Sequence, residues 1–381
     1  MSDNNEQENE IDFTKLQPWN NKDYPVAVNS IRYNQDFTLL TLGTSKGYKI
    51  FFASNLKPAN DPTEAVTNLG DINIAMTYYK SSLVFLLPSR NNSNYSNNEI
   101  IVFDDFYQDK FATFKDKSEE ILNFFVSKNT LFLITLSKII VLEILSFKII
   151  EIIININSIN QLLSYNYFDF IAYTELKDKQ KIFIKYYHHQ NQRIVSLNKK
   201  IVNSSFDYMQ TIQLSPSGQL IAVVSIFGNK IHIYYTQTGK LKECIFLSPF
   251  ILTIERVLFS KKENYVLTLK NENKFHIYKI RKNQNDNPKC VCNKYNDKNI
   301  TMENKEENTG IFGFFRKSSR NKDIKDAHAF SEFVGNISFI DFDGQQNKDL
   351  ILINKQGQFY KYHFKKKPCG RITPTFSFQW E

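Results

Sequence analysis

Cysteine, glycine and proline are scarce in this sequence. There are four cysteines, 12 glycines and 10 prolines in 381 residues. A long chain with so few cysteines has no disulfide framework, which favours a reducing compartment. Cys290 and Cys292 have no second pair at zinc-binding spacing, so we expect no metal site and no bound cofactor. The low glycine and proline content excludes collagen-like chains and chains disordered by Pro/Gly repeats.

Long hydrophobic runs are also absent. The most apolar stretch, 131–156, is interrupted by Lys138, Glu143, Lys148 and Glu151, so it does not span a bilayer. The N-terminal sequence MSDNNEQENEIDF is acidic and polar, and it lacks the basic start and apolar core of a secretory signal. Any contact with a membrane is therefore expected from one side.

Catalytic and nucleotide-binding motifs are missing as well. There is no GxxxxGK phosphate loop, and no Ser/His/Asp or Cys/His set stands out, so we expect no enzymatic activity. His188 and His189 lie in YYHHQNQR, which we predict to be an exposed polar turn. The net charge of +9 suits an anionic membrane surface as well as nucleic acid, and it also suits an ordinary soluble protein. Nucleic-acid binding is not expected, because the basic residues are mostly scattered lysines.

Short apolar runs make up most of what is present. Hydrophobic residues are 42% and aromatic residues 14% of the chain, which favours a β-rich core. Runs such as TLLTLG, SLVFLL and TLFLITL, separated by polar turns, are typical of strands. Residues 1–24 are predicted to be a disordered acidic arm and 25–367 the folded domain. A flexible polar insertion is expected at 281–329, and 368–381 is assigned to a C-terminal tail.

The strands recur in sets of four. In IQLSPSGQLIAVVSIFGNKIHIYYTQTGKLKECIF, tight turns at SPSG, FGNK and TQTGK separate four strands. Similar sets begin near Val26, Ile72, Ile121, Asn157, Tyr208, Ile254 and Ile337, mostly at the period of roughly 40–45 residues typical of propeller blades. We therefore predict an all-β, seven-bladed β-propeller of four-stranded antiparallel blades, with the insertion in blade six. A pair of β-sandwiches is the alternative.

The stretch YNQDFTLLTLGTSKGYKIF, residues 33–51, carries the most specific motif. Asn34 and Asp36 are expected to cap a turn, and Gly47 to allow a tight hairpin. The stretch resembles the opening blade of the PROPPIN family, also called WIPI proteins, with Tyr33 in place of Phe. The resemblance covers most of 26–365 but is weak in 72–205, and the Trp-Asp and Gly-His signatures of a WD-repeat blade are absent.

This resemblance implies a propeller that docks edge-on to membranes without being an enzyme. It implies binding to phosphatidylinositol 3-phosphate and the 3,5-bisphosphate, and a role in autophagy and endolysosomal traffic. The implied protein partners are a bridge-like lipid-transfer protein and scaffolds of the conjugation machinery. The implied location is cytoplasmic, peripheral on preautophagosomal, endosomal or vacuolar membranes, and we expect a monomer.

The resemblance also points to a lipid-binding site that has lost its arginines. The family reads lipid through Phe/Leu-Arg-Arg-Gly in the outer strand of blade five, where this chain has Ile245, Phe246, Leu247 and Ser248. Neighbouring strand residues face opposite ways, so the two arginine positions serve separate pockets. Losing both is expected to weaken headgroup binding by roughly two to four orders of magnitude. The remaining pocket positions implied by the resemblance are Ser225, Asn229, His232, Lys270 and His276. Lys270, Lys274 and His276 could still meet a phosphate, although ordinary turn and strand residues explain them more simply.

The insertion carries an aromatic segment beside basic residues. Its members are Ile311, Phe312, Phe314, Phe315, Arg316 and Lys317. Aromatic rings next to cations suit the headgroup boundary of an anionic membrane. The same segment could instead fold back on the propeller as a satellite hydrophobic cluster.

Two functions remain open at this stage. The first is a PROPPIN-like peripheral membrane adaptor whose headgroup pockets are degenerate. The second is a propeller that has lost phosphoinositide binding and serves as a protein-interaction scaffold. A hydrolase propeller ranks far below both, since it would need converging carboxylates or a metal set in the central channel.

Overall fold

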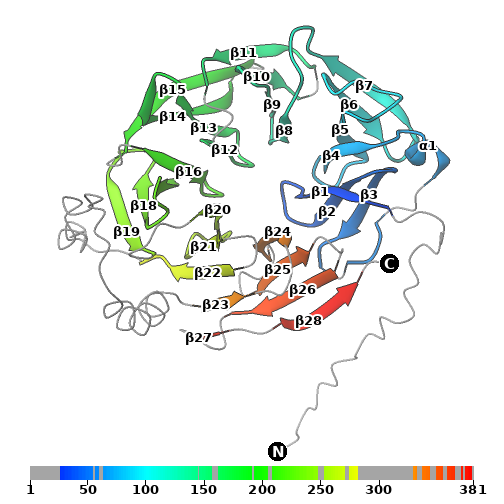
Figure 1. Ribbon diagram of the computed structural model, residues 1–381. Coiled ribbons are helices and arrows are strands. Elements are labelled where there is room, and N and C mark those ends of the chain that lie inside the picture. The colour runs from blue at the N-terminus through cyan, green and yellow to red at the C-terminus, as the bar shows by residue number, and fades with distance from the viewer. Residues whose placement is uncertain are drawn as a thin grey trace, which may run out of the picture.

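The computed structural model describes residues 26–54, 56–59, 63–144, 146–156, 162–190, 193–204, 208–247, 253–270, 274–281, 329–332, 337–343, 349–354, 358–364, 370–371 and 374–379. These residues form seven sheets arranged in a ring, with the first strand of each sheet nearest the centre (Figure 1). The predicted seven-bladed β-propeller is therefore confirmed, and the alternative of two β-sandwiches is wrong. The arm at 1–24 and nearly all of the insertion lie outside the described residues.

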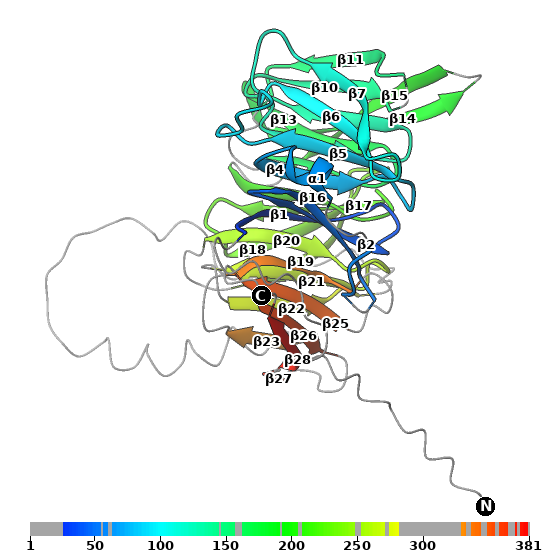
Figure 2. The ribbon, with the colours of Figure 1, turned by 90° about the vertical axis from the view of Figure 1, so that its right-hand side faces the viewer.

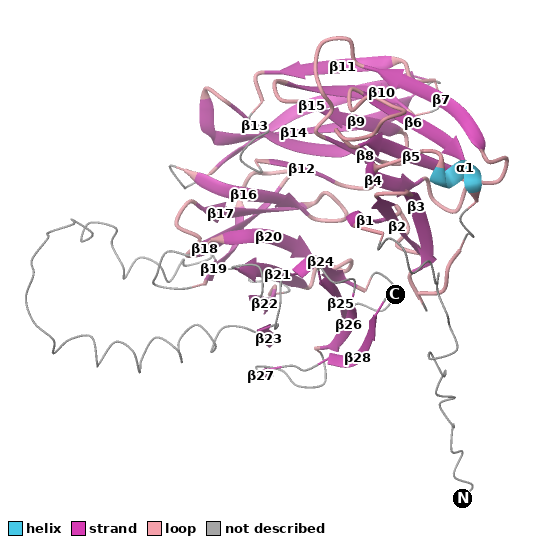
Figure 3. Ribbon diagram, turned by 45° about the vertical axis from the view of Figure 1, so that its right-hand side comes forward, coloured by secondary structure: helices cyan, strands magenta, loops and turns pink. Residues whose placement is uncertain are grey.

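The first four blades contain strands β1 to β15 and one short helix (Figure 3). Blade one has β1 (Val28–Tyr33), β2 (Leu39–Thr44) and β3 (Gly47–Phe52), followed by α1 (Glu64–Thr67). Blade two has β4 (Ile72–Thr77), β5 (Leu83–Pro88), β6 (Glu99–Asp104) and β7 (Asp109–Lys115). Blade three has β8 (Asn123–Val126), β9 (Thr130–Ile134), β10 (Lys138–Glu143) and β11 (Ile149–Ile154). Blade four has β12 (Leu163–Tyr165), β13 (Phe170–Glu175), β14 (Asp178–Gln190) and β15 (Arg193–Asn203).

The remaining three blades contain strands β16 to β28. Blade five has β16 (Met209–Leu214), β17 (Leu220–Ser225), β18 (Lys230–Tyr235) and β19 (Leu241–Phe246). Blade six has β20 (Ile254–Phe259), β21 (Tyr265–Lys270), β22 (Lys274–Lys279), β23 (Ala329–Glu332) and β27 (Gly370–Arg371). Blade seven has β24 (Ile337–Phe342), β25 (Asp349–Asn354), β26 (Gln358–His363) and β28 (Pro374–Gln379).

Three blades differ in detail from the predicted scheme. Blade one shows three strands among the described residues, and blade six gains β27, which pairs in parallel with the outer edge of β23. In blade seven, β28 pairs antiparallel with β26 and completes the sheet. Since β28 falls in 368–381, a strand of the propeller comes from the segment assigned to a tail. The predicted insertion joins β22 to β23, the third and fourth strands of blade six.

Burial explains why these runs become strands of stacked blades. The second strands are covered on both faces, and all six residues of β2 and of β17 are buried. The outer strand β7 is instead largely exposed. Hydrophobic clusters lie between neighbouring blades, as where Tyr48 and Ile50 of blade one pack with Ile72 and Val84 of blade two. The apolar faces of the sheets therefore supply the core of the ring.

The opening motif ties blade one to its neighbours. Asn34 Oδ1 accepts hydrogen bonds from the backbone N–H groups of Thr38 (2.9 Å) and Leu39 (3.0 Å), so the predicted turn cap is confirmed. Gln35 Nε2 donates to the backbone carbonyl of Val126 in blade three at 3.0 Å. Gln35 Oε1 accepts from the Tyr79 N–H in blade two at 2.6 Å. The motif therefore builds the scaffold, and its presence does not by itself report on lipid binding.

A hairpin of blade four extends beyond the ring. Strands β14 and β15 are 13 and 11 residues long, and their paired ends project past the neighbouring strands (Figure 2). Their backbones pair as far as Gln190 with Arg193. His188 and His189 therefore lie in a strand, and the prediction of a turn at these residues was wrong, because the chain reverses only after Gln190.

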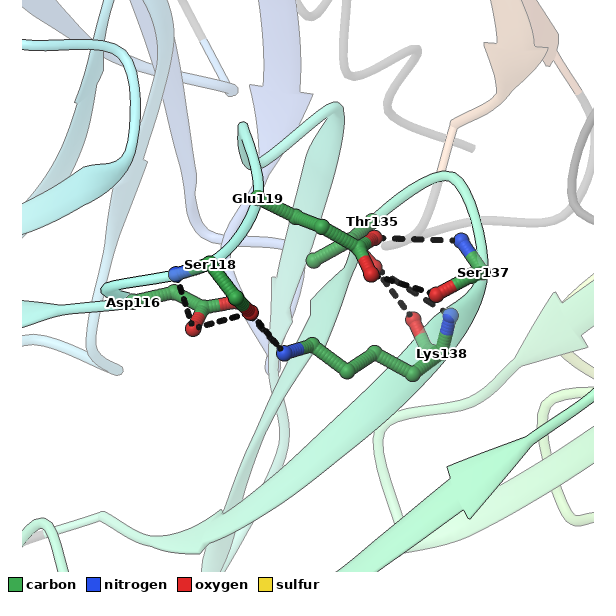
Figure 4. A network of polar contacts seen from close by, with 6 residues as sticks. All are labelled: Asp116, Ser118, Glu119, Thr135, Ser137 and Lys138. Atoms are coloured by element: carbon green, nitrogen blue, oxygen red, sulfur yellow. Dashed lines mark hydrogen bonds and ion pairs between the residues drawn. The ribbon is translucent and has the colours of Figure 1, made fainter.

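Polar side chains join blade two to blade three (Figure 4). Lys138, at the start of β10, lies 2.9 Å from Asp116 Oδ2 and donates to Ser118 Oγ at 2.6 Å. Burial opposes ionisation of Asp116, but hydrogen bonds from Lys138 and Ser118 outweigh it and hold the pKa of this carboxyl below its usual value. Glu119 accepts hydrogen bonds from Ser137. These contacts fix the β7–β8 linker against the β9–β10 turn.

The ring closes through side chains where blade one meets blade seven. Tyr33, Leu40 and Phe51 of blade one share a cluster with Phe339 and Ile351 of blade seven. The Tyr33 and Phe339 rings meet edge to face, with centroids 5.8 Å apart. Among the described strands, none is exchanged between these two blades.

Candidate lipid headgroup site

The positions expected to bind a lipid headgroup gather at one end of blade five. Ser225 is the last residue of β17, Asn229 lies in the turn before β18, and Phe246 ends β19. Phe246 is paired with Lys230 across the sheet, and the Leu247 N–H donates to the Asn229 carbonyl at 2.8 Å. The structure therefore brings these positions together, as the alignment of strands requires.

The polar groups at this end already satisfy one another. Ser225 is buried, and its hydroxyl donates to Asn229 Oδ1 at 2.7 Å. The Ser225 carbonyl accepts from the Gly228 N–H at 2.8 Å, which closes the turn. A phosphate bound here would have to replace the Ser225–Asn229 hydrogen bond. Because one hydrogen bond is exchanged for another, the gain in binding free energy would be modest.

The two arginine positions differ sharply in their surroundings. Phe246 is half-buried at the end of β19. Leu247 is 1% exposed and belongs to the cluster between blades five and six, together with Ile254 and Val257. The second position therefore contributes to the hydrophobic core, where a charged group is costly.

Blade six supplies the remaining predicted positions. Lys270 ends β21 and is only 4% exposed, and its backbone is paired with exposed Lys274 at the start of β22. His276 is half-buried and is paired with Thr268. Lys270 and Lys274 lie at the β21–β22 end of this blade, which corresponds to the β17–β18 end of blade five.

Both histidines are held in the neutral form. Burial and then Lys230 lower the pKa of His232 to about 4. Burial, followed by Lys270 and Lys274, lowers the pKa of His276 to about 3. Each ring contacts the tyrosine hydroxyl two residues along its strand, Tyr234 at 3.2 Å and Tyr278 at 3.3 Å. At neutral pH neither imidazole supplies a positive charge to a phosphate.

Exposed apolar side chains at the same end of blade five were missed by the sequence analysis. Tyr208 precedes β16, and Ile226 and Phe227 form the β17–β18 turn. All three are exposed. The Ile226 N–H donates to the Tyr208 carbonyl at 3.0 Å, so the segment before β16 and the β17–β18 turn lie side by side. The signal was present in SIFGNK, where two large apolar residues stand in a hairpin turn that is usually polar.

Several other features bear on what the chain can bind. The predicted insertion residues Ile311, Phe312, Phe314, Phe315, Arg316 and Lys317 lie outside the described residues. Within the described part of the chain, no group of three or more metal-ligating side chains is assembled. None of the helices in that part has the length and apolarity needed to cross a bilayer.

Comparison with known proteins bears on the fold. No protein-family model matches the chain. Kluyveromyces lactis Hsv2 superposes with a TM-score of 0.69 at 11% identity, covering 93% of this chain and 99% of that chain. KlAtg21, solved in complex with the coiled-coil of AgAtg16, has a TM-score of 0.64 at 14% identity, covering 93% of this chain and 100% of that chain. The chain has the fold of a PROPPIN propeller.

A propeller outside this group is also similar. The Swd1 β-propeller domain of Myceliophteria thermophila has a TM-score of 0.54 at 10% identity, covering 87% of this chain and 95% of that chain. At such low identities the comparisons concern the fold. Within the PROPPIN-like fold, this chain has Phe246 and Leu247 where the resemblance expects two arginines.

Proposed function

We propose that the protein is a non-enzymatic, PROPPIN-like peripheral membrane adaptor that acts in autophagy or endolysosomal traffic. The observation that carries this proposal is the likeness to Hsv2 and KlAtg21 over 93% of the chain. The proposed location is cytoplasmic, on preautophagosomal, endosomal or vacuolar membranes. The opening motif and the ordered sequence of blades support the same assignment.

The headgroup pockets of this adaptor are proposed to be degenerate. Each missing arginine removes charge-assisted hydrogen bonds worth about 1.5–3 kcal/mol. Phe246 and Leu247 offer no donor in their place, and buried Leu247 fills the second position. His232 and His276 are neutral near pH 7 because their pKa values are lowered. Affinity for phosphatidylinositol 3-phosphate is therefore expected to be weak.

Apolar side chains are proposed to supply the membrane contact instead. The aromatic segment of the insertion, with Phe312 and Phe315, is one source, and Arg316 and Lys317 add attraction to anionic lipid. Tyr208, Ile226 and Phe227 on blade five are a second source. Each large side chain removed from water contributes about 1.5–3 kcal/mol before ordering costs, so a few suffice for reversible binding.

Vesicle flotation tests this proposal. The protein is mixed with vesicles of phosphatidylcholine alone, with added phosphatidylserine, or with added phosphatidylinositol 3-phosphate. We expect flotation with both anionic mixtures, little extra gain from the 3-phosphate, and loss in the double variant Phe312→Asp, Phe315→Asp. The matched control is Phe106→Asp with Tyr107→Asp, which changes two exposed aromatics on blade two. An equal loss of flotation in the control variant would refute a specific membrane contact by Phe312 and Phe315.

A protein-interaction scaffold without lipid binding is the second candidate. It is favoured by Leu247, whose burial leaves no room for the second headgroup contact. Its partners would be autophagy proteins, such as a bridge-like lipid-transfer protein or a coiled coil, since KlAtg21 was solved with the coiled-coil of AgAtg16. Failure to float with any vesicle, together with a monomer that binds such a coiled coil in solution, would favour this candidate.

A further inference from the structure

The first strands of the blades enclose a central cavity of about 740 Å³. Its wall includes residues of β1, β4, β8, β12, β16, β20 and β24, so every blade contributes. Cavities of a few hundred to a thousand Å³ hold small molecules in proteins. The wall combines aromatic side chains with a few charged ones, and the charged residues that line it are Arg32, Arg256, Glu255 and Asp341.

Arg32 reaches across this cavity from blade one. Its Nη1 donates to the Tyr165 hydroxyl in blade four at 2.7 Å, and its Nη2 donates to Asn123 Oδ1 in blade three at 2.9 Å. These neutral partners fix the guanidinium without cancelling its charge. A guanidinium has five N–H donors, so others remain for a further acceptor.

Arg256 of blade six lines the same cavity. Burial in the ring, and next the charge of Arg32, lower the pKa of Arg256, whereas Asp341 acts in the opposite direction. Among the described residues, no carboxylate lies within 4 Å of either guanidinium, so neither forms an ion pair. Arginine stays charged in proteins, so two like charges face one cavity without direct neutralisation.

One of the two carboxyl groups that line the cavity, Asp341, carries a reduced negative charge. Burial raises the pKa of Asp341 to about 7, against the Phe342 N–H and Arg256, which lower it. Near neutral pH Asp341 is therefore only partly ionised, and Glu255 is the other carboxylate of the wall. Two hydroxyls of the same wall, Ser30 and Tyr33, are buried with no hydrogen-bond partner among the described residues.

We propose that the central cavity binds a small phosphorylated molecule, with the guanidiniums of Arg32 and Arg256 on its phosphate. A phosphate monoester presents three terminal oxygens and nearly two negative charges, which suits two forked donors arriving from different strands. A single carboxylate offers only two oxygens and one charge. The aromatic wall, including Tyr165 and Tyr167, accommodates the rest of the ligand. This site is separate from the rim positions on blades five and six.

Isothermal titration calorimetry on the full chain tests the proposal. The probes are inorganic phosphate, inositol 1,3-bisphosphate, adenosine 5′-monophosphate and citrate. We expect one-to-one binding of at least one phosphate ester and weaker binding of citrate. A preference for inositol 1,3-bisphosphate identifies a lipid-type headgroup, and a preference for the nucleotide identifies a soluble ester. No binding of any phosphorylated probe, or tighter binding of citrate, overturns the proposal.

Substitutions separate the cavity from the rim and from general folding effects. Arg256→Met removes the charge at similar length and is expected to weaken binding about ten- to hundredfold, the loss of one charge-assisted contact. The matched control is Arg90→Met, since the Arg90 side chain is 72% exposed on blade two and pairs only with Glu120 among the described residues. Lys274→Met probes the rim. Loss of binding in Lys274→Met but not in Arg256→Met overturns the central site, and unchanged thermal unfolding of Arg256→Met shows that folding is intact.

Discussion

Arginine substitutions at Phe246 and Leu247, the two positions where the family resemblance expects arginine, test the geometry of the site. Leu247 is 1% exposed in the core between blades five and six, whereas Phe246 is half-buried at the end of β19. Removing a buried leucine side chain costs about 2–5 kcal/mol, and placing an unpaired charge there adds to that cost. Leu247→Arg is therefore expected to lose more than about 4 kcal/mol, a large part of a typical unfolding free energy.

Phe246→Arg is expected to behave differently. Its side chain can extend along the rim, so the free energy of unfolding should change by about 1 kcal/mol or less. Leu247→Met is the matched control, since a volume-conserving change in a core usually costs less than about 1.5 kcal/mol. Urea denaturation followed by circular dichroism measures all three. Equal stability of Leu247→Arg and Phe246→Arg would mean that position 247 faces solvent, and the argument for a closed second pocket would fail.

Three further predictions concern other parts of the ring. The pKa of Asp341 is raised to about 7, so the folded state binds its proton more tightly than the unfolded state, and this contribution to stability is lost as pH rises from about 4 to 7. Asp341→Asn should make the melting temperature less dependent on pH over that window. An unchanged pH dependence of the melting temperature would contradict the assignment. Gly47 has φ +81°, and an added Cβ would lie 2.2 Å from the Val66 carbonyl oxygen. Gly47→Ala should therefore lower the free energy of unfolding in urea by about 1–3 kcal/mol or more, and an unchanged urea midpoint would rule out this backbone conformation. Leu40→Ala, at a fully buried position of the closing cluster, should cost about 2–5 kcal/mol, whereas a cost below 1 kcal/mol, checked in the same denaturation assay, would argue against tight packing there.

The fold was predictable because its signal is repeated along the chain. Strand runs, turns and spacing recur blade after blade, so an error in one blade does not disturb the count. The insertion was predicted for the same reason, as an excess of sequence within blade six, where β22 and β23 pair in the structure. The turn cap at Asn34 depends on residues close in sequence, and such local contacts are readable from sequence.

The site was less predictable because it depends on contacts between distant residues. Leu247 is buried only because blade six packs against it, which a strand pattern does not reveal. The lowered pKa of His232 comes first from burial by the surrounding blades. Arg32 and Arg256 stand far apart in the sequence, and they line the same cavity only because the ring brings β1 and β20 to its centre. Composition alone does not predict that these two arginines share a cavity.

The boundary between blades one and seven bears on how the chain can be circularly permuted. Since no described strand is exchanged there, the described residues hold this boundary by side-chain contacts such as that of Tyr33 with Phe339. Circular permutants that open the polypeptide at another blade boundary and link the original ends would keep every sheet intact, apart from the two-residue β27. Every described blade is a separate sheet, so opening any boundary breaks no backbone ladder. Blades one and seven also come from opposite ends of the sequence, so we expect their boundary to open most readily and its amide protons to exchange with deuterium sooner than those of β9 or β17.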